Sequence, residues 1–339
     1  MNLEAILSKK VMQKLGLTPQ GDMTYPNEGR IAYNIIVPTR ERGKVLFRCY
    51  PEQSSKAALG YGIKQAKFEI KVLVFLAAKG APTPKPIAFS TGDYSLEQDG
   101  FFIFAYPLQE GKTLERKDLS QQVANDAGTL LSQIIEHSES YEPKGDEPDG
   151  DIEYIKTILN NFLKRRPDYK DEEIFQDIHT HLSNQVFLRD IERTPKGLVH
   201  GDYFFENIIS KDGKLIGVID FGDAYYGYLL MDIVIGSMEF AMKDDEVWDM
   251  DLFEDFVKAN KNWLKKNNVS FDLFHNVLLA NCGRFVAHLY NLAQDELEEN
   301  SNAKGFIKPD NNPYIERFYT FQKTEIKQEL EHRYQLALS

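Results

Sequence analysis

The hydrophobic and polar positions of this chain first predict strands. In Lys44–Tyr50 the side chains alternate between two faces, with Arg48 and Cys49 on opposite ones. Apolar runs of strand length also occur at Ile31–Val37 and Phe101–Tyr106. These segments predict three strands near the start of the chain.

A helical pattern lies between the second and third of these strands. From about Ile63 to Lys79 the apolar residues recur at helical spacing, and they form the stripe Ile70, Leu73, Val74 and Ala77. Gly80 suits the left-handed position after a helix, and Pro82 prevents its continuation. The sequence therefore predicts a helix that ends at Gly80.

Beyond Tyr106–Gly111 the helical periods lengthen and strands become rare. We therefore expect an α+β chain of two lobes, a sheet-containing lobe at residues 1–107 and a larger, mostly helical lobe at residues 108–339. In the second lobe, Asp244–Asp255 carries apolar residues at helix-compatible spacings and predicts an amphipathic helix.

Composition restricts the classes of protein to consider. The 339 residues are 42% hydrophobic and 27% charged, enough apolar material for a large core. No window approaches the roughly 18 apolar residues of a membrane span, and the chain's first residues predict an amphipathic helix rather than a signal peptide. With only Cys49 and Cys282 there is no disulfide framework. We therefore expect a cytoplasmic protein without a membrane partner.

The charge of the chain is strongly negative. A formal net charge of −12 argues against a nucleic-acid partner and mildly favours a cationic small substrate, although solubility alone explains it as well. The segment Glu139–Glu153 is rich in acids, prolines and glycines. It is either a solvated linker or an acidic rim over a basic substrate.

The most informative stretch is Leu198–Asp223, which reads LVHGDYFFENIISKDGKLIGVIDFGD. Its Asp-Gly dipeptide suits a type I′ turn, because both central residues of that turn need positive φ. The apolar runs on either side then form a hairpin, and Asn207 and Asp220 lie at its open end. Asp202 lies in the loop that leads to this end.

Asp202, Asn207 and Asp220 are residue types that phosphoryl transfer uses. A carboxylate can accept the proton of a hydroxyl group, and Mg²⁺ prefers hard oxygen ligands. The order HGD, Asn207 and DFG has the spacing of kinase catalytic and metal-binding loops. No G-x-S-x-G elbow and no zinc-ligand spacing supports acyl transfer or zinc chemistry instead.

Phosphate-binding residues are expected in the first lobe. Arg48 on the strand and Glu69 on the helix can form the ion pair that orients nucleotide phosphates, although Glu69 could instead be an exposed helix charge. Protein kinases have lysine where this chain has Arg48, and arginine keeps the charge and adds a bidentate fork. The glycine-rich loop expected before the first strand contains one glycine, in Asn27–Arg30.

Three other polar residues of the motif region have candidate roles. We expect His200 and Asp232 to support the loop around Asp202 structurally. Asp223 has two readings: it binds a substrate ammonium that Tyr225 and Tyr226 cover, or it is a turn residue.

The motifs HGDYFFEN, VIDFGD and DI, in that order, resemble the aminoglycoside phosphotransferase/choline kinase superfamily. The resemblance extends to the strand Lys44–Tyr50, the helix and turn Glu69–Pro86, the hinge segment Phe102–Gly111 and the helix at Gly283-Arg284-Phe285, and it covers most of residues 27–290. It implies a two-lobed protein-kinase-like fold, with a small antiparallel sheet and one main helix in the first lobe and a larger, mostly helical second lobe. It also implies ATP or GTP with Mg²⁺ as phosphoryl donor and a small hydroxyl compound as acceptor.

The resemblance also implies residue roles. Asp202 is the expected base, Asn207 and Asp220 the expected metal ligands, and Arg48, paired with Glu69, the expected phosphate contact. The hinge residues expected to contact the nucleotide are Tyr106 and Leu108. The residues expected to contact the acceptor are Asp223, Tyr225, Tyr226 and Arg284.

The acceptor is less sharply defined. The stretch IDFGDAYYGYLLMDI is similar to hydroxylysine kinases, and type-II homoserine kinases and aminoglycoside kinases have a similar layout. We expect an amino alcohol or a hydroxylated amino acid of the homoserine, hydroxylysine or choline kind. An antibiotic kinase and a catalytically silent kinase-like binding module are the alternatives. The sequence leaves the acceptor, the choice of ATP or GTP and the oligomeric state open.

Overall fold

The computed structural model describes residues 3–26, 32–52, 62–170, 172–244, 247–299 and 312–339. Two compact units are present. The first contains Met1–Lys112 together with Ile209–Ala224, and the second contains Thr113–Ile208 together with Tyr225–Ser339. The lobe division at residues 107 and 108 stays a prediction beside these boundaries.

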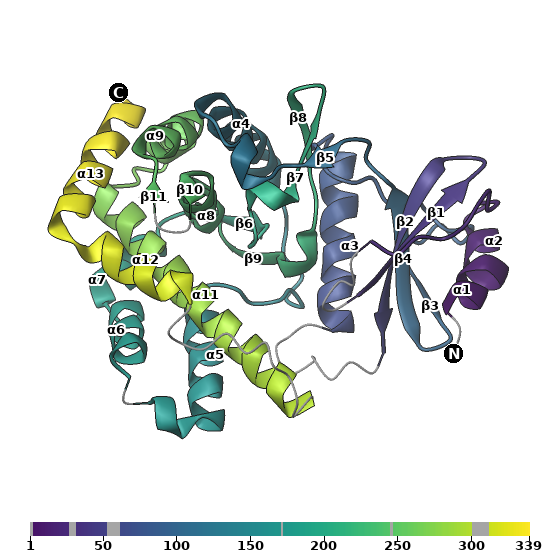
Figure 1. Cartoon of the computed structure of the whole chain (residues 1–339), viewed down its shortest axis with the longest axis horizontal. Coiled ribbons are helices and arrows are strands. Elements are labelled where there is room, and N and C mark those ends of the chain that lie inside the picture. The colour runs from purple at the N-terminus through teal and green to yellow at the C-terminus, as the bar shows by residue number, and fades with distance from the viewer. Residues whose placement is uncertain (1–2, 27–31, 53–61, 171, 245–246, 300–311) are drawn as a thin grey trace. The chain divides into compact units, whose positions relative to one another are not determined.

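A four-stranded antiparallel sheet with the order β1-β2-β4-β3 forms the centre of the first unit (Figure 1). Its strands are β1 (Tyr33–Thr39), β2 (Gly43–Pro51), β3 (Leu96–Gln98) and β4 (Phe101–Pro107). The alternation predicted around Arg48 is confirmed, because Val45, Phe47 and Cys49 are fully buried together in one core. This core also contains residues of the N-terminal helical segment, which comprises α1 (Leu3–Ile6), a π-helical stretch (Leu7–Val11) and α2 (Met12–Lys14).

The predicted helix of the first unit is α3 (Ile63–Ala78). It buries one face, which includes Phe68, Glu69 and Leu73. Gly80 follows with a φ of +82°, as expected for the residue that ends a helix. The helix therefore has the predicted position and ending.

The predicted hairpin consists of β7 (Ile208–Lys211) and β8 (Lys214–Val218), which form a small sheet with β5 (Lys112–Thr113). Asp212 and Gly213 between the strands have φ values of +51° and +73°. Positive φ at both turn residues confirms the predicted type I′ turn.

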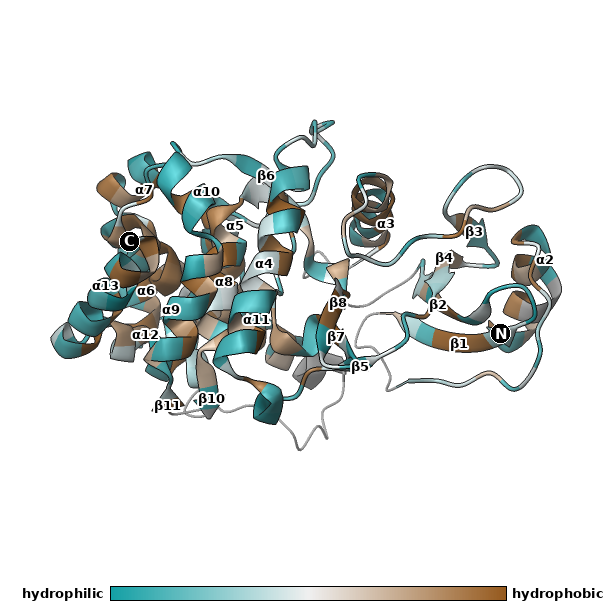
Figure 2. Ribbon diagram, turned by 90° about the horizontal axis from the view of Figure 1, so that it is seen from above, coloured by the Kyte–Doolittle hydropathy of each residue, from teal (hydrophilic) through white to brown (hydrophobic). Residues whose placement is uncertain are grey.

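The second unit is mostly helical, and in Figure 2 both hydrophobic and hydrophilic residues occur along α4 and α9, as expected for amphipathic helices. Its helices are α4 (Gln121–Ser138), α5 (Ile152–Arg165), α6 (Glu173–Leu182), α7 (Gln185–Ile191), α8 (Leu230–Phe240), α9 (Met250–Ala259), α10 (Lys261–Lys266), α11 (Phe271–Glu299), α12 (Pro313–Gln322) and α13 (Thr324–Leu338). Every residue of α8 is buried, so this helix lies in the core. Two short antiparallel pairs complete the unit: β6 (Lys196–Val199) with β9 (Tyr225–Tyr228), and β10 (Met242–Asp244) with β11 (Val247–Trp248).

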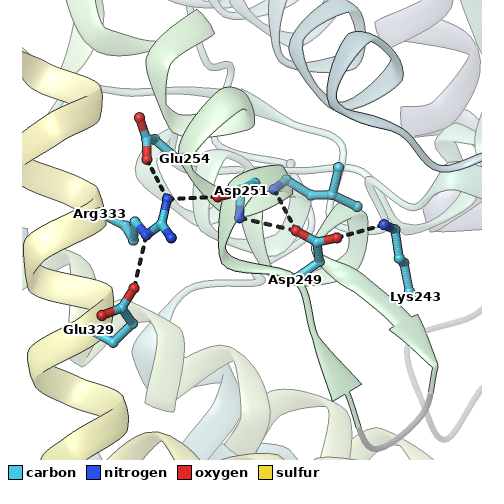
Figure 3. A network of polar contacts seen from close by, with 7 residues as sticks. Lys243, Asp249, Asp251, Glu254, Glu329 and Arg333 are labelled. Atoms are coloured by element: carbon cyan, nitrogen blue, oxygen red, sulfur yellow. Dashed lines mark hydrogen bonds and ion pairs between the residues drawn. The ribbon is translucent and has the colours of Figure 1, made fainter.

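The amphipathic helix predicted at Asp244–Asp255 is only partly correct, because the helix begins at Met250 and the residues before it contribute to β10 and β11. Asp249 explains the late start: its side chain accepts hydrogen bonds from two backbone N–H groups of the first helical turn and caps the helix. Figure 3 shows the polar contacts around this cap. Lys243 pairs with Asp249, and Arg333 of α13 pairs with Asp251, Glu254 and Glu329.

The acidic segment between α4 and α5 makes ordered polar contacts. Glu139 accepts a hydrogen bond from the Trp263 indole at 2.6 Å. Glu147 accepts hydrogen bonds from the backbone N–H groups of Lys144 and Gly145, both at 2.7 Å. These carboxylates thus have partners within the second unit, as in a structured connection.

None of the helices described here is long and apolar enough to cross a membrane.

Candidate active site

The loop between β6 and β7 carries Asp202 and is held from the core by Asp232 of α8. Asp232 is fully buried, and its two carboxylate oxygens accept hydrogen bonds from the backbone N–H groups of His200 at 2.6 Å and Gly201 at 2.9 Å. Burial raises the pKa of Asp232, although His200 and these two N–H groups act against the rise. Asp202 in turn donates its N–H to Nδ1 of His200 at 3.2 Å. Asp232 and His200 are therefore structural supports of the loop, as the sequence predicted.

Asp202 and Asn207 lie together at the end of this loop, where a short 3₁₀ turn (Phe205–Asn207) leads into β7. Both side chains are half-buried. The Asn207 amide nitrogen donates to the Asp202 carboxylate at 3.0 Å and to the Asp202 carbonyl oxygen at 2.8 Å. Because the nitrogen is engaged in this way, the amide oxygen of Asn207 is the atom suited to bind a cation.

Arg48, Glu69 and Asp220 meet in the first unit. The Arg48 guanidinium on β2 lies 2.9 Å from the Glu69 carboxylate on α3, and its Nη1 lies 2.9 Å from an oxygen of Asp220. Tyr50, two residues after Arg48 on the same face of the strand, donates its hydroxyl to Glu69 at 2.6 Å. The structure thus brings Arg48, Glu69 and Asp220 together, and Glu69 is not the exposed charge of the alternative reading.

The electrostatics of this cluster depend on burial. The Glu69 side chain is 1% exposed, whereas the Asp220 side chain is 51% exposed. Burial raises the pKa of Glu69 to about 7, and the negative charges of Asp220 and Asp223 add to the rise, while Arg48 and the Tyr50 hydroxyl act against it. Asp220 is therefore the acid of this cluster that solvent or a ligand reaches.

The backbone at Asp220 has an uncommon conformation. Its φ of +61° and ψ of +68° are left-handed, a region that residues other than glycine seldom adopt. Gly222 supports the local packing, because a Cβ atom there would lie only 3.2 Å from an Asp220 carboxylate oxygen and 3.4 Å from Arg48. This strained turn directs the Asp220 side chain towards Arg48.

The predicted hinge residues lie at the end of β4. Tyr106 is buried and pairs with Leu46 of β2, and Leu108 donates its N–H to the Lys44 carbonyl oxygen at 2.8 Å. The expected glycine-rich loop at Asn27–Arg30 lies outside the described residues.

The predicted acceptor residues have different surroundings. Asp223 is half-buried at the end of a 3₁₀ turn (Phe221–Asp223) in the first unit. In the second unit, Tyr225 is 2% exposed, and its ring centre lies 5.6 Å from the guanidinium carbon of Arg284. Tyr226 packs against Tyr141, with 6.2 Å between the ring centres. Arg284 is buried and donates a hydrogen bond to the Gly201 carbonyl oxygen.

Two supporting residues were not identified from the sequence. Tyr50 bonds to Glu69, and its position on the same strand face as Arg48 was the available signal. Gln65 donates to the carbonyl oxygen of Ala224 at 2.7 Å and so ties α3 to the segment that follows Asp220-Phe221-Gly222. Gln65 precedes Glu69 by four residues, which places both on one face of the helix.

Comparison with known proteins identifies the class of this chain. The model of the phosphotransferase enzyme family (APH) matches residues 24–265, and the chain belongs to this family. A homoserine kinase from Methylobacillus flagellatus is 24% identical over 207 residues, which are 61% of this chain and 60% of that relative. The chain thus matches less than two thirds of the length of this curated relative.

Solved structures share the fold. The amicoumacin kinase hAmiN in complex with AMP-PNP and Ca²⁺ has a TM-score of 0.60 at 15% identity, covering 97% of this chain and 96% of that one. The ethanolamine kinase of Plasmodium vivax has a TM-score of 0.61 at 14% identity, covering 96% and 88%. These similarities confirm the predicted α+β, kinase-like fold.

Proposed function

We propose that this chain is a small-molecule kinase that transfers the γ-phosphoryl group of ATP or GTP to a hydroxyl group of an amino alcohol or hydroxylated amino acid. The observation that carries the proposal is the pairing of Asp202 with Asn207 on a loop that Asp232 anchors to the core. This arrangement fixes a half-buried carboxylate beside an amide, as a general base beside a metal ligand requires.

Asp202 is the proposed general base. The acceptor oxygen attacks the γ-phosphorus, and the bond between this phosphorus and the β,γ-bridging oxygen breaks, so that the nucleoside diphosphate leaves. Asp202 accepts the proton of the acceptor hydroxyl group. The hydrogen bond from Asn207 occupies one carboxylate oxygen of Asp202. This contact helps to orient the carboxylate that we propose as the proton acceptor.

The residues proposed as metal ligands fit Mg²⁺. Asp220 offers a half-exposed carboxylate, and Asn207 offers an amide oxygen, both hard donors of the type that Mg²⁺ prefers. When bound, the ion neutralises charge that builds up on the phosphates. The ligand roles of Asn207 and Asp220 are part of this proposal.

The first unit is proposed to hold the nucleotide. Nη1 of Arg48 lies 2.9 Å from a carboxylate oxygen of Glu69 and 2.9 Å from one of Asp220, so the guanidinium is oriented before any phosphate binds. Tyr106 and Leu108, at the end of β4, are the proposed contacts for the rest of the nucleotide.

The proposed acceptor carries an amine. Asp223 supplies a carboxylate for it and Tyr226 an aromatic face, whereas Tyr225, which the sequence also suggested, is only 2% exposed. Because Arg284 already faces the ring of Tyr225, Tyr226 is the ring that we expect to cover a substrate cation. Similarity to a homoserine kinase and an ethanolamine kinase supports an acceptor of this class.

An antibiotic phosphotransferase is the second candidate function. The similarity to an amicoumacin kinase favours it, as does the net charge of −12. A silent binding module is disfavoured, because Asp202, Asn207 and Asp220 are all present. Both cysteines are buried free thiols, which agrees with the cytoplasmic location that we propose.

A coupled nucleotide-consumption screen tests the proposal. The purified chain is incubated with Mg²⁺ and either ATP or GTP, and with amino alcohols, hydroxylated amino acids and aminoglycosides in turn. We expect turnover with an amine-bearing hydroxyl compound, and loss of that turnover in Asp202→Asn. Consumption that occurs only with aminoglycosides would support the second candidate, and no consumption with any acceptor would refute both.

A further inference from the structure

Arg284 lies in the middle of α11 and is 3% exposed. Its Nη1 donates a hydrogen bond to the carbonyl oxygen of Gly201. Its guanidinium carbon lies 5.6 Å from the ring centre of Tyr225 and 5.3 Å from that of Phe285. Burying a charged guanidinium is costly, and the carbonyl oxygen, the aromatic faces and the negative charge of Asp232 are among the interactions that compensate it.

Gly201 is therefore held on both sides. Asp232 of α8 accepts its N–H at 2.9 Å, and Arg284 of α11 donates to its C=O. Its φ of +79° is in the left-handed region that glycine adopts without strain. Because the next residue is Asp202, these two contacts fix the peptide that precedes the proposed base.

The neighbour of Arg284 on α11 contacts the loop on the other side of Asp202. The ring of Phe285 lies 5.4 Å from that of Phe204 and stacks on Tyr314 of α12 at 4.6 Å. Helix α11 thus contacts the loop one residue before Asp202 and two residues after it.

We propose that Arg284 is a positioning residue for phosphoryl transfer, which orients the Asp202 carboxylate by donating to the Gly201 C=O while Asp232 accepts the Gly201 N–H. The inference rests on the proposed function, in which Asp202 is the base. It gives Arg284 a role different from the acceptor contact expected from the sequence, because the buried guanidinium is engaged with the loop backbone.

The test compares Arg284→Met, which removes the donor, with Arg284→Lys, which keeps a charged donor. Arg165→Met is the matched control, because Arg165 pairs at 2.5 Å with Asp295, which also lies on α11, and so anchors the same helix at another place. Backbone hydrogen exchange is measured by mass spectrometry on peptides that cover residues 200–207. Steady-state kinetics use MgATP with L-homoserine, hydroxylysine, ethanolamine and choline as acceptors.

In Arg284→Met we expect faster exchange at residues 200–207 and a kcat lower by about 10- to 100-fold, the scale of a lost hydrogen bond to a charged group. The KM values for nucleotide and acceptor should change by less than about threefold, because the residue acts through Asp202. The exchange rate and kcat of Arg284→Lys should lie between those of Arg284→Met and the wild type. Arg165→Met should leave the exchange of residues 200–207 unchanged.

Unchanged exchange at residues 200–207 in Arg284→Met overturns the inference, whatever the activity. A raised acceptor KM with unchanged kcat also overturns it and indicates direct substrate contact. If the methionine variant does not fold, the lysine variant decides in the same way: loop exchange and kcat equal to the wild type overturn the inference. If the wild type phosphorylates none of the acceptors, the proposed function fails separately, while the exchange data still test the contact.

Discussion

Replacing Arg48 and Glu69, singly and together, should affect the stability of the chain and its affinity for nucleotide in different ways. The two side chains are 10% and 1% exposed. Removing one partner of a buried pair typically costs about 3–5 kcal/mol, because a charge is left without compensation. For Glu69→Leu we expect the free energy of unfolding to fall by about 3 kcal/mol, the lower end of this range. The loss is limited because Arg48 keeps Asp220 at 2.9 Å as a second partner.

Arg48→Met should lower the free energy of unfolding by a similar amount, for a different reason. At pH 8 Glu69 is ionised in the wild type, because its pKa is about 7. Once Arg48 is gone, Glu69 can take up a proton, and this limits the loss to about 3 kcal/mol. The double variant contains neither charge and should lose only about 1 kcal/mol, since apolar replacements of whole buried pairs are often nearly neutral.

The assay combines urea unfolding at pH 8 with calorimetric titration of MgATP. Both tryptophans of the chain, Trp248 and Trp263, lie in the second unit, so their fluorescence reports that unit while far-UV circular dichroism reports the whole chain. The double variant should be nearly as stable as the wild type and should bind nucleotide as poorly as Arg48→Met. If the double variant lost about 6 kcal/mol of unfolding free energy, the sum of the two single losses, the coupling between Arg48 and Glu69 would be refuted.

The other predictions concern the proposed site directly. Asp202→Asn should lower kcat by about two to four orders of magnitude, the scale of a positioned general base, while nucleotide affinity in calorimetry stays near the wild-type value; near-normal turnover would remove the base assignment. Asp220→Ala should abolish Mg²⁺-dependent nucleotide binding, whereas Asn207→Ala should weaken it less because water can replace a neutral ligand; unchanged affinity in the Asp220 variant contradicts the metal role. Asp223→Asn should raise the KM for an amine-bearing acceptor far more than the KM for the nucleotide, and equal effects on both would exclude amine recognition.

Local patterns predicted the elements that carry the motifs. The two-residue alternation around Arg48 predicted the strand correctly, because one face of the strand packs on a core. Gly80 marked the end of α3 correctly, because a glycine adopts the positive φ of this position without strain. The spacing of Asp202, Asn207 and Asp220 defined the candidate site, because these residues lie close together in the sequence around one hairpin.

Contacts between distant parts of the chain could not be predicted in this way. Arg284 meets Gly201 across 83 residues, and nothing in the local pattern of α11 selects that carbonyl oxygen as its partner. The late start of α9 depends on the capping of two backbone N–H groups by Asp249. Apolar spacing alone does not distinguish that cap from a helical residue.

The two cysteines have a practical consequence for measurements of motion. Cys49 and Cys282 are fully buried, and burial raises the pKa of both thiols, that of Cys49 to about 12. Maleimide reagents attack thiolates, so neither native residue should react in the folded protein. Spin labels could therefore be attached at engineered surface cysteines, one in each unit, without first removing the native thiols. Pulsed electron paramagnetic resonance would then measure how the distance between the units changes when nucleotide is added.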